Sequence, residues 1–219
     1  MTAITTVRPR RAWTLDLEAV HERFPGVPAD RAELETRVTL ASIGFVPVTL
    51  IAITTFGMWG LRQLALAVLM PAVLVLGALV HRTTVARSIV ARAVVRGVVA
   101  TFGYDLFRWS FLWLGLMQTD PIPHIGTALG LSPAWVFGYL WRYLGNGGGL
   151  AIAFTAFGLR GVRAGMLFGA FVCAGLLATL AIAPLGQELL FPLSPTTVVM
   201  ATVGHLIYGA ILGATSARR

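Results

Sequence analysis

The sequence predicts an all-α protein, a polytopic transmembrane helical bundle of about six spans. Of its 219 residues, 57% are hydrophobic and only 12% are charged, and the mean hydropathy is +0.79. Soluble domains are typically about 45–50% apolar and about 25% charged, so this composition indicates a membrane protein. Two further observations support that class: long apolar segments, and an uneven distribution of arginine between the connections.

Six apolar segments reach the length that a membrane span requires. About 20 helical residues cross a hydrocarbon layer of about 30 Å. Pro47 and Pro71 fall inside two of the segments, where membrane helices tolerate proline. The expected spans cover residues 38–58, 62–80, 94–116, 133–156, 163–183 and 196–215.

Arginine collects on one side of these spans. All 17 basic residues are arginine, and 14 of them lie in the N-terminal segment, around the second and fourth connections, or in the C-terminal tail. The opposite connections contain Arg62, Asp120 and Glu188. Because cytoplasmic loops are rich in arginine, we expect a multi-pass protein of the bacterial inner (plasma) membrane with both termini cytoplasmic. The net charge of +8 then reflects topology, so the expected partner is the lipid bilayer and not nucleic acid.

Residues 1–37 form a cytosolic N-terminal arm that precedes the bundle of residues 38–219. The arm lacks the apolar segment of a signal peptide. Its stretch TLDLEAVHERF predicts a short amphipathic helix, which FPGVPAD interrupts. Asp30 then predicts a helix N-cap, with Glu33 completing a capping box. The arm either lies on the membrane or the bundle, or docks a partner protein.

The second half of the chain contains an internal repeat. LSPAWVFGYLWRYLGNGGGLA, beginning at Leu131, aligns without a gap with LSPTTVVMATVGHLIYGAILGA, beginning at Leu193. Gly147 aligns with Gly209 in this register. The repeat units, about 94–156 and 163–215, predict two parallel helical hairpins. In transporters, repeats of this kind often enclose a site between the halves.

Polar side chains fall near the middle of three expected spans. The two Ser-Pro pairs predict helix starts, and ten helical residues from each, about 15 Å, reach half the thickness of the bilayer. The candidate ligand-binding or ion-binding residues in this layer are Asp105, Arg108, Arg142, Asn146, His205 and Tyr208.

Two arginines and one aspartate lie in this layer. Asp105 and Arg108 are at positions i and i+3 and share one helix face. A charge at the bilayer centre costs about 2.5–3.5 kcal/mol on insertion scales, so pairing is expected. With Arg142, the layer has surplus positive charge that requires water, a backbone carbonyl, a bound anion or a partner's carboxylate. The group is a packing network, a ligand or ion site, or a catalytic site.

His205, Cys173 and the glycine-rich segment GNGGG are the remaining candidates for a function. His205 packs with a hydrogen bond, takes part in proton transfer, or binds a metal or cofactor. No second histidine lies within an expected span, so we expect no metal site and no cofactor. The single cysteine, Cys173, excludes an intramolecular disulfide. GNGGG at 145–149 predicts either close helix packing or a broken helix that contacts a ligand.

The connection between the third and fourth spans is QTDPIPHIGTALGLSP. Its prolines argue against a regular helix at its start. Asp120 and His124 lie in this connection, on the same side of the bundle as Glu188. These three residues are either solvated loop residues or the mouth of a metal site.

Motifs across residues 95–214 resemble a family of uncharacterised bacterial polytopic membrane proteins. The pattern is ATxxYDxxR, a Pro-Ile loop, NG in the next span and HxxYGxxLG in the last. A histidine usually stands three residues before NG in that family, whereas this chain has Tyr143 there. The resemblance implies a membrane bundle and brings no activity. Its elements are Ala100-Thr101, Tyr104-Asp105, Arg108, Pro121-Ile122, Asn146-Gly147, His205, Tyr208-Gly209 and Gly213.

Three functions agree with these features. The first is binding or translocation of a small solute, ion or lipid at the mid-membrane polar layer. The second is an accessory or assembly subunit of a larger membrane complex, docked through the arm, or a homo-oligomer. The third is a membrane-embedded enzyme for a lipid-like substrate, with Asp105 as acid or base and His205 or Arg108 stabilising charge.

Overall fold

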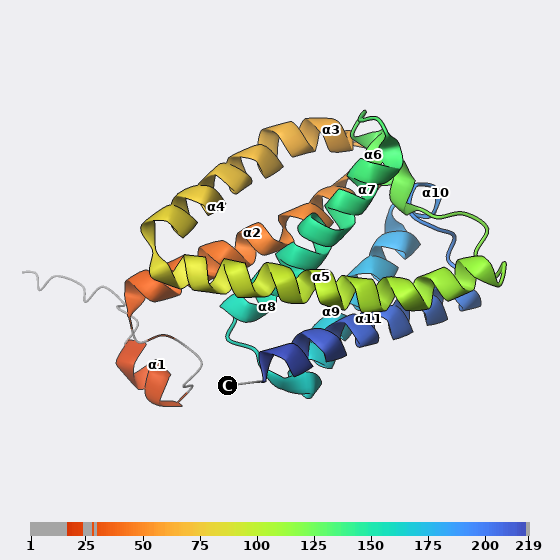
Figure 1. Ribbon diagram of the computed structural model, residues 1–219. Coiled ribbons are helices and arrows are strands. Elements are labelled where there is room, and N and C mark those ends of the chain that lie inside the picture. Colours follow the sequence, from red (N-terminus) through yellow and green to blue (C-terminus); the bar gives the residue numbers. More distant parts are fainter. Residues whose placement is uncertain (1–16, 24–27, 29, 218–219) are drawn as a thin grey trace, which may run out of the picture.

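The computed structural model describes residues 17–23, 28 and 30–217, which are helical apart from short connections. No strand occurs within those ranges, so the all-α class is confirmed. Figure 1 shows the arrangement of the helices. Their bounds are α1 Leu17–Arg23, α2 Arg31–Thr55, α3 Leu61–Leu64, η1 Ala65–Leu69, α4 Met70–Arg82, α5 Thr84–Trp113, α6 Ile122–Ala128, α7 Ala134–Leu140, η2 Trp141–Gly148, α8 Gly149–Ala156, α9 Gly161–Ile182, α10 Gly186–Leu189 and α11 Pro195–Ser216.

Four of the described helices are long and apolar enough to cross a membrane. The other two expected spans are also helical, since residues 94–113 belong to α5 and residues 134–156 form α7, η2 and α8. Asp105, Arg108 and Arg142 interrupt the apolar character of these two segments. A membrane bundle is therefore supported, and the number of six spans stays a prediction. The four helices are Arg31–Thr55, Leu61–Arg82, Gly161–Ile182 and Pro195–Ser216.

The two ends of the bundle gather different connections (Figure 1). One end contains the start of α2, the α4–α5 turn, the α8–α9 connection and the end of α11. These are the arginine-rich segments of the sequence. The other end contains the α2–α3, α5–α6 and α9–α11 connections. The fold thus places the arginine-rich connections at one end, as the topology argument predicts, while the identity of the membrane and the orientation stay predictions.

The core forms where α2, α5, α8, α9 and α11 meet. Leu40, Ala93, Phe154 and Leu212 are fully buried there. The helix Leu61–Arg82 lies outside this core and is only 6% buried over its most apolar window. Its apolar side chains therefore face outward, as expected of a helix in contact with lipid.

Glycines bring the helices of each predicted hairpin into close contact. A methyl group on Gly97 of α5 would overlap the Gly147 carbonyl oxygen of η2. A methyl group on Gly165 of α9 would likewise overlap the Gly209 carbonyl oxygen of α11. Small residues of this kind let membrane helices approach closely. Because Gly147 and Gly209 are aligned by the repeat, the equivalent crossings support the duplication, which stays a prediction.

The start of α2 agrees in part with the prediction from the sequence. Asp30 is the N-cap and accepts hydrogen bonds from the N–H groups of Ala32 and Glu33 at 3.2 and 3.1 Å. The Glu33 carboxylate pairs with Arg37 at 2.7 Å, in place of the expected capping box. Most of the arm, including residues 1–16, lies outside the described residues, so its role stays a prediction.

Candidate functional site

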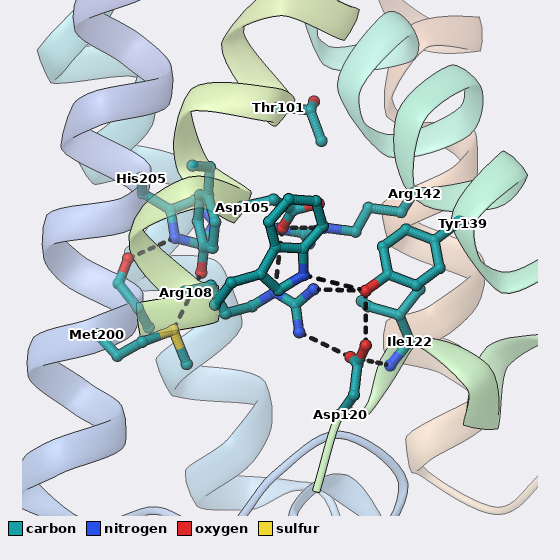
Figure 2. Close-up of polar contacts among 12 residues, drawn as sticks. Thr101, Asp105, Arg108, Asp120, Ile122, Tyr139, Arg142, Met200 and His205 are labelled. Carbon is teal, nitrogen blue, oxygen red and sulfur yellow. Dashed lines mark hydrogen bonds and ion pairs between the residues drawn. The ribbon is translucent and has the colours of Figure 1, made fainter. Parts of the chain in front are cut away.

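Asp105 lies at the centre of a buried ion-pair network (Figure 2). Its side chain is 0% exposed. Arg108, on the same face of α5, donates from Nε to Oδ1 at 3.0 Å. Arg142, on η2, donates from Nε to both carboxylate oxygens at 2.8 and 3.0 Å and from Nη2 to Oδ1 at 2.5 Å. The pairing expected from the i, i+3 spacing is present, and η2 adds the second arginine.

Arg108 extends the network to the connection after α5. Its Nη1 donates to Oδ1 of Asp120 at 2.6 Å, and its Nη2 donates to the Tyr139 hydroxyl at 3.0 Å. That hydroxyl donates to Oδ2 of Asp120 at 2.6 Å and accepts from Trp109 Nε1 at 3.2 Å. Each of the three guanidinium nitrogens of Arg108 thus has an acceptor, which offsets the cost of burying its charge.

Asp120 supplies the negative charge that the midplane layer lacks. Two arginines face two aspartates, so the network is neutral and the expected surplus of positive charge is wrong. Burial raises the pKa of Asp120, but hydrogen bonds from Tyr139, the Ile122 N–H and Arg108 outweigh it and hold that pKa below its usual value. Asp120 is therefore a paired and partly buried residue, with a side chain that is 24% exposed. No group of three or more metal-ligating side chains occurs among the described residues.

A cavity of about 530 Å³ lies beside the network, between α2, α5, η2, α9 and α11. Its lining is mostly apolar and includes no acidic residue among the described ones. Asp105 does not line it, because the carboxylate lies enclosed behind the two arginines. The other five candidate residues do line it, namely Arg108, Arg142, Asn146, His205 and Tyr208.

The cavity opens along the side of the bundle, between α2 and α9. The lining residues that are also exposed are Thr49 of α2 and Phe171, Ala174, Gly175 and Ala178 of α9. A Cβ atom at Gly175 would meet nothing within 4 Å. Both helices are long and apolar enough to cross a membrane. The opening therefore lies on the surface that lipid would cover.

The glycine-rich segment GNGGG lies in a helix that is not broken. Residues Trp141–Gly148 form the π-helix η2, which passes directly into α8. Single π-helical turns are rare and are frequent at functional sites. The Gly147 carbonyl accepts a hydrogen bond from Tyr208 of α11 at 2.8 Å. Asn146 Oδ1 is buried and has no hydrogen-bond partner among the described residues.

His205 connects the cavity wall to Tyr104. Its Nδ1 lies 2.7 Å from the Ala201 carbonyl oxygen. Because a carbonyl oxygen only accepts, Nδ1 carries a hydrogen and Nε2 is the acceptor of the neutral ring. Tyr104 packs edge-on against this ring at 5.1 Å, and the Arg142 guanidinium carbon lies 4.6 Å from the centroid of the Tyr104 ring. The expected hydrogen bond of His205 is thus present within its own helix.

The sequence does not single out Tyr104, Trp109 or Tyr139 as binding residues, and it names Asp120 only as a solvated loop residue or as part of a metal-site mouth. Tyr104 is part of the YDxxR element, and its ring contacts both His205 and Arg142. Asp120 and Tyr139 join the network because the α5–α6 connection folds back onto α5 and α7. Neither residue has a spacing signal, because this contact depends on the path of a loop.

No protein-family model, curated protein or solved structure matches this chain in the comparisons. The resemblance to bacterial polytopic membrane proteins therefore stays a prediction. The geometry of the network and of the cavity is the basis for a proposal about function.

Proposed function

We propose that this protein is a multi-pass protein of the bacterial inner membrane that binds an amphipathic, lipid-like molecule in the cavity between α2 and α9. The observation that carries this proposal is the cavity of about 530 Å³ with apolar walls, which opens between two candidate membrane helices. Small-molecule sites are typically clefts of about 300–1,000 Å³ with mostly apolar walls and a few placed polar groups. An opening on the lipid-facing side favours a ligand that partitions into the bilayer.

The polar end of such a ligand has two partners at η2. Arg142 lines the cavity, and its side chain is 14% exposed although it pairs with Asp105. Asn146 Oδ1 is a buried acceptor with no partner among the described residues. Leaving a buried polar group unpaired costs about 1–3 kcal/mol, so a rotation that turns this amide toward a ligand carrying a hydrogen-bond donor would recover that energy. We therefore infer a head group that carries both a donor and an acceptor.

The same geometry disfavours cation binding in the cavity and an enzyme reaction that uses Asp105. A cation site needs acidic or carbonyl oxygens, and the described lining of the cavity contains arginine and no carboxylate. An enzyme that uses Asp105 as acid or base needs that carboxylate within reach of the substrate. Asp105 is 0% exposed and holds two arginines, so it orders the wall of the cavity. The accessory-subunit hypothesis stays a prediction.

Native mass spectrometry after detergent exchange tests the binding proposal. We expect the wild-type protein to retain a specific lipid-like molecule and Asn146→Leu to lose it. Because Asn146→Leu replaces an unpaired buried acceptor by an apolar side chain of similar size, thermal stability should not fall. Trp141→Phe is the matched control, since Trp141 Nε1 is also buried without a partner among the described residues but Trp141 does not line the cavity.

The pattern of retention decides the outcome. Loss in Asn146→Leu with retention in Trp141→Phe supports a site at Asn146. A bulky substitution at the opening, Gly175→Phe, should also abolish retention while the protein still folds, because a Cβ atom there meets nothing within 4 Å. Equal retention in all variants, or none in the wild type, would show that the cavity does not bind a resident molecule.

A further inference from the structure

A second pocket, of about 340 Å³, lies at the arginine-rich end of the bundle. It is distinct from the cavity and shares no lining residue with it. Polar side chains dominate its wall, in contrast to the apolar wall of the cavity. The lining residues are Glu33, Arg37, Val85, Ser88, Ile89, Arg92, Arg96, Thr155, Gly158, Leu159, Arg160 and Ser216.

Four arginines from three parts of the fold surround this pocket. Arg37 comes from α2, Arg92 and Arg96 from α5, and Arg160 from the α8–α9 connection. Glu33 is the one acidic residue among the described lining, and it pairs with Arg37 at 2.7 Å. The lining therefore contains more arginines than acidic residues. Helix packing brings these arginines together from distant positions, since Arg37 and Arg160 are more than 120 residues apart in the sequence.

Two of the arginines, Arg92 and Arg160, have N–H groups without an acceptor among the described residues. Arg92 donates from Nη2 to the Ser88 hydroxyl at 3.1 Å, a neutral acceptor that leaves the charge uncompensated. No side-chain hydrogen bond or ion pair is present for Arg160 within the described part of the chain. Both residues are exposed. An incoming anion therefore needs to displace no carboxylate from either of them.

The start of a long helix lies next to the pocket, because the lining residue Arg160 is its N-cap. Arg160 is the N-cap of α9, a helix of 22 residues, and no side chain caps that end. The first N–H groups of a helix lack intrahelical partners and carry the positive end of its dipole. Anions bind readily where such an end meets basic side chains.

The arginines of the pocket lie at the ends of expected spans, where lipid head groups would be. Arg37 immediately precedes the expected span 38–58, and Arg92 precedes the expected span 94–116. Arg160 lies between the expected spans 133–156 and 163–183. Arginine at such boundaries attracts anionic lipids, and its planar fork binds phosphate oxygens in pairs.

We propose that this pocket binds a phosphate group, carried either by free inorganic phosphate or by the phosphomonoester head group of an anionic lipid. Arg92 and Arg160, which pair with no carboxylate among the described residues, match a phosphate that bears up to two negative charges. The site is independent of the proposed ligand of the cavity. A purely topological role for these arginines does not require them to converge on one pocket.

The test compares two double variants of equal charge. Arg92→Gln with Arg160→Gln removes two positive charges from the pocket. Arg82→Gln with Arg163→Gln removes two from the same end of the bundle, at residues that do not line the pocket. Each protein, full length and in phosphatidylcholine nanodiscs at constant ionic strength, is titrated with inorganic phosphate by calorimetry. In a second arm, nanodiscs also contain phosphatidic acid, and native mass spectrometry measures its retention.

We expect the pocket variant to bind at least roughly tenfold more weakly than wild type, because it loses two guanidinium groups that donate to phosphate oxygens. We expect the control variant to bind as wild type. Saturable binding of inorganic phosphate assigns the site to a free anion. Retention of phosphatidic acid alone assigns it to a lipid head group. Equal weakening in both variants shows diffuse surface charge and overturns the proposal, as does the absence of binding in both arms.

A variant that is expected to bind phosphate more tightly distinguishes loss of the site from loss of folding, because a misfolded protein would not gain affinity. Glu33→Gln removes the one described carboxylate of the lining and frees Arg37. The pocket then gains net positive charge without losing an arginine, so affinity for phosphate should rise several-fold. Unchanged or weaker binding in Glu33→Gln would contradict the proposed site.

Discussion

Arg142 and Asp105 are 37 residues apart in the sequence and lie on different helices, yet Arg142 Nε donates to both carboxylate oxygens of Asp105 at 2.8 and 3.0 Å. Arg108 donates to the same carboxylate at 3.0 Å. One buried aspartate thus joins α5 to η2 and orients both arginines that line the cavity. Asp105 therefore stabilises the packing of α5 on η2 and also positions the two arginines at the cavity wall.

Removing the charge of Asp105 should destabilise the whole bundle. Asp105→Asn leaves Arg142 without an anion and Arg108 with Asp120 alone. Breaking one partner of a buried ion pair typically costs about 3–5 kcal/mol. We expect this loss in the free energy of unfolding, measured in mild detergent. Glu35→Gln is the control, because its ion pair with Arg31 is largely exposed and such pairs contribute little. Equal stability of the two variants would contradict a buried network.

Asp120 should make the stability of the folded protein depend on pH in the acid range. Its pKa is lowered in the folded protein by hydrogen bonds from Tyr139, the Ile122 N–H and Arg108, which outweigh burial. A carboxylate with a lowered folded-state pKa stabilises the protein above its unfolded pKa of about 3.9, and this contribution is lost as pH falls through the folded-state value. The melting temperature should therefore decrease as the pH is lowered below about 4.

The matched variants isolate this contribution. Asp120→Asn should lower stability at neutral pH and flatten the dependence on pH in the acid range. Glu188→Gln removes an exposed carboxylate at the same end of the bundle and should leave the acid dependence unchanged. The same slope in Asp120→Asn as in wild type would show that Asp120 is not the group responsible.

Gly97 should tolerate no larger side chain. A methyl group there overlaps the Gly147 carbonyl oxygen, and overpacking of this kind typically costs about 1–3 kcal/mol. Gly97→Ala should therefore lower the melting temperature. Gly77→Ala on α4, where a Cβ atom meets nothing within 4 Å, should leave it unchanged or raise it, since alanine favours helix over glycine. A drop of similar size in both variants would argue against close packing of α5 on η2.

Tyr208 should stabilise the π-helical segment. Its hydroxyl donates to the Gly147 carbonyl at 2.8 Å from a buried position. Tyr208→Phe leaves that carbonyl without this donor, and we expect a loss of about 1 kcal/mol in the free energy of unfolding. Tyr104→Phe should lower the free energy of unfolding less, because the Tyr104 hydroxyl donates only a long hydrogen bond, of 3.8 Å, to the sulfur of Met200. The reverse order would contradict a specific role for the bond to Gly147.

The sequence by itself determined the class of fold and the depth of the polar residues. Composition and apolar runs predict helices because each backbone polar group in a bilayer needs a partner within its own segment. The i, i+3 spacing of Asp105 and Arg108 predicts their pairing because helix geometry is local. The aligned glycines likewise mark positions of close packing, since only the absence of a side chain permits it.

Only the tertiary structure decided what these residues do together. Depth along a helix leaves its rotation open. The sequence therefore does not distinguish Asp105, which is enclosed behind the arginines, from Asn146, which lines the cavity. The neutrality of the network depends on Asp120, and the phosphate pocket depends on Arg37 and Arg160. These residues meet through loop paths and helix crossings, which many distant contacts set jointly. No local spacing rule encodes such contacts, and the charge balance of both sites therefore emerges only on packing.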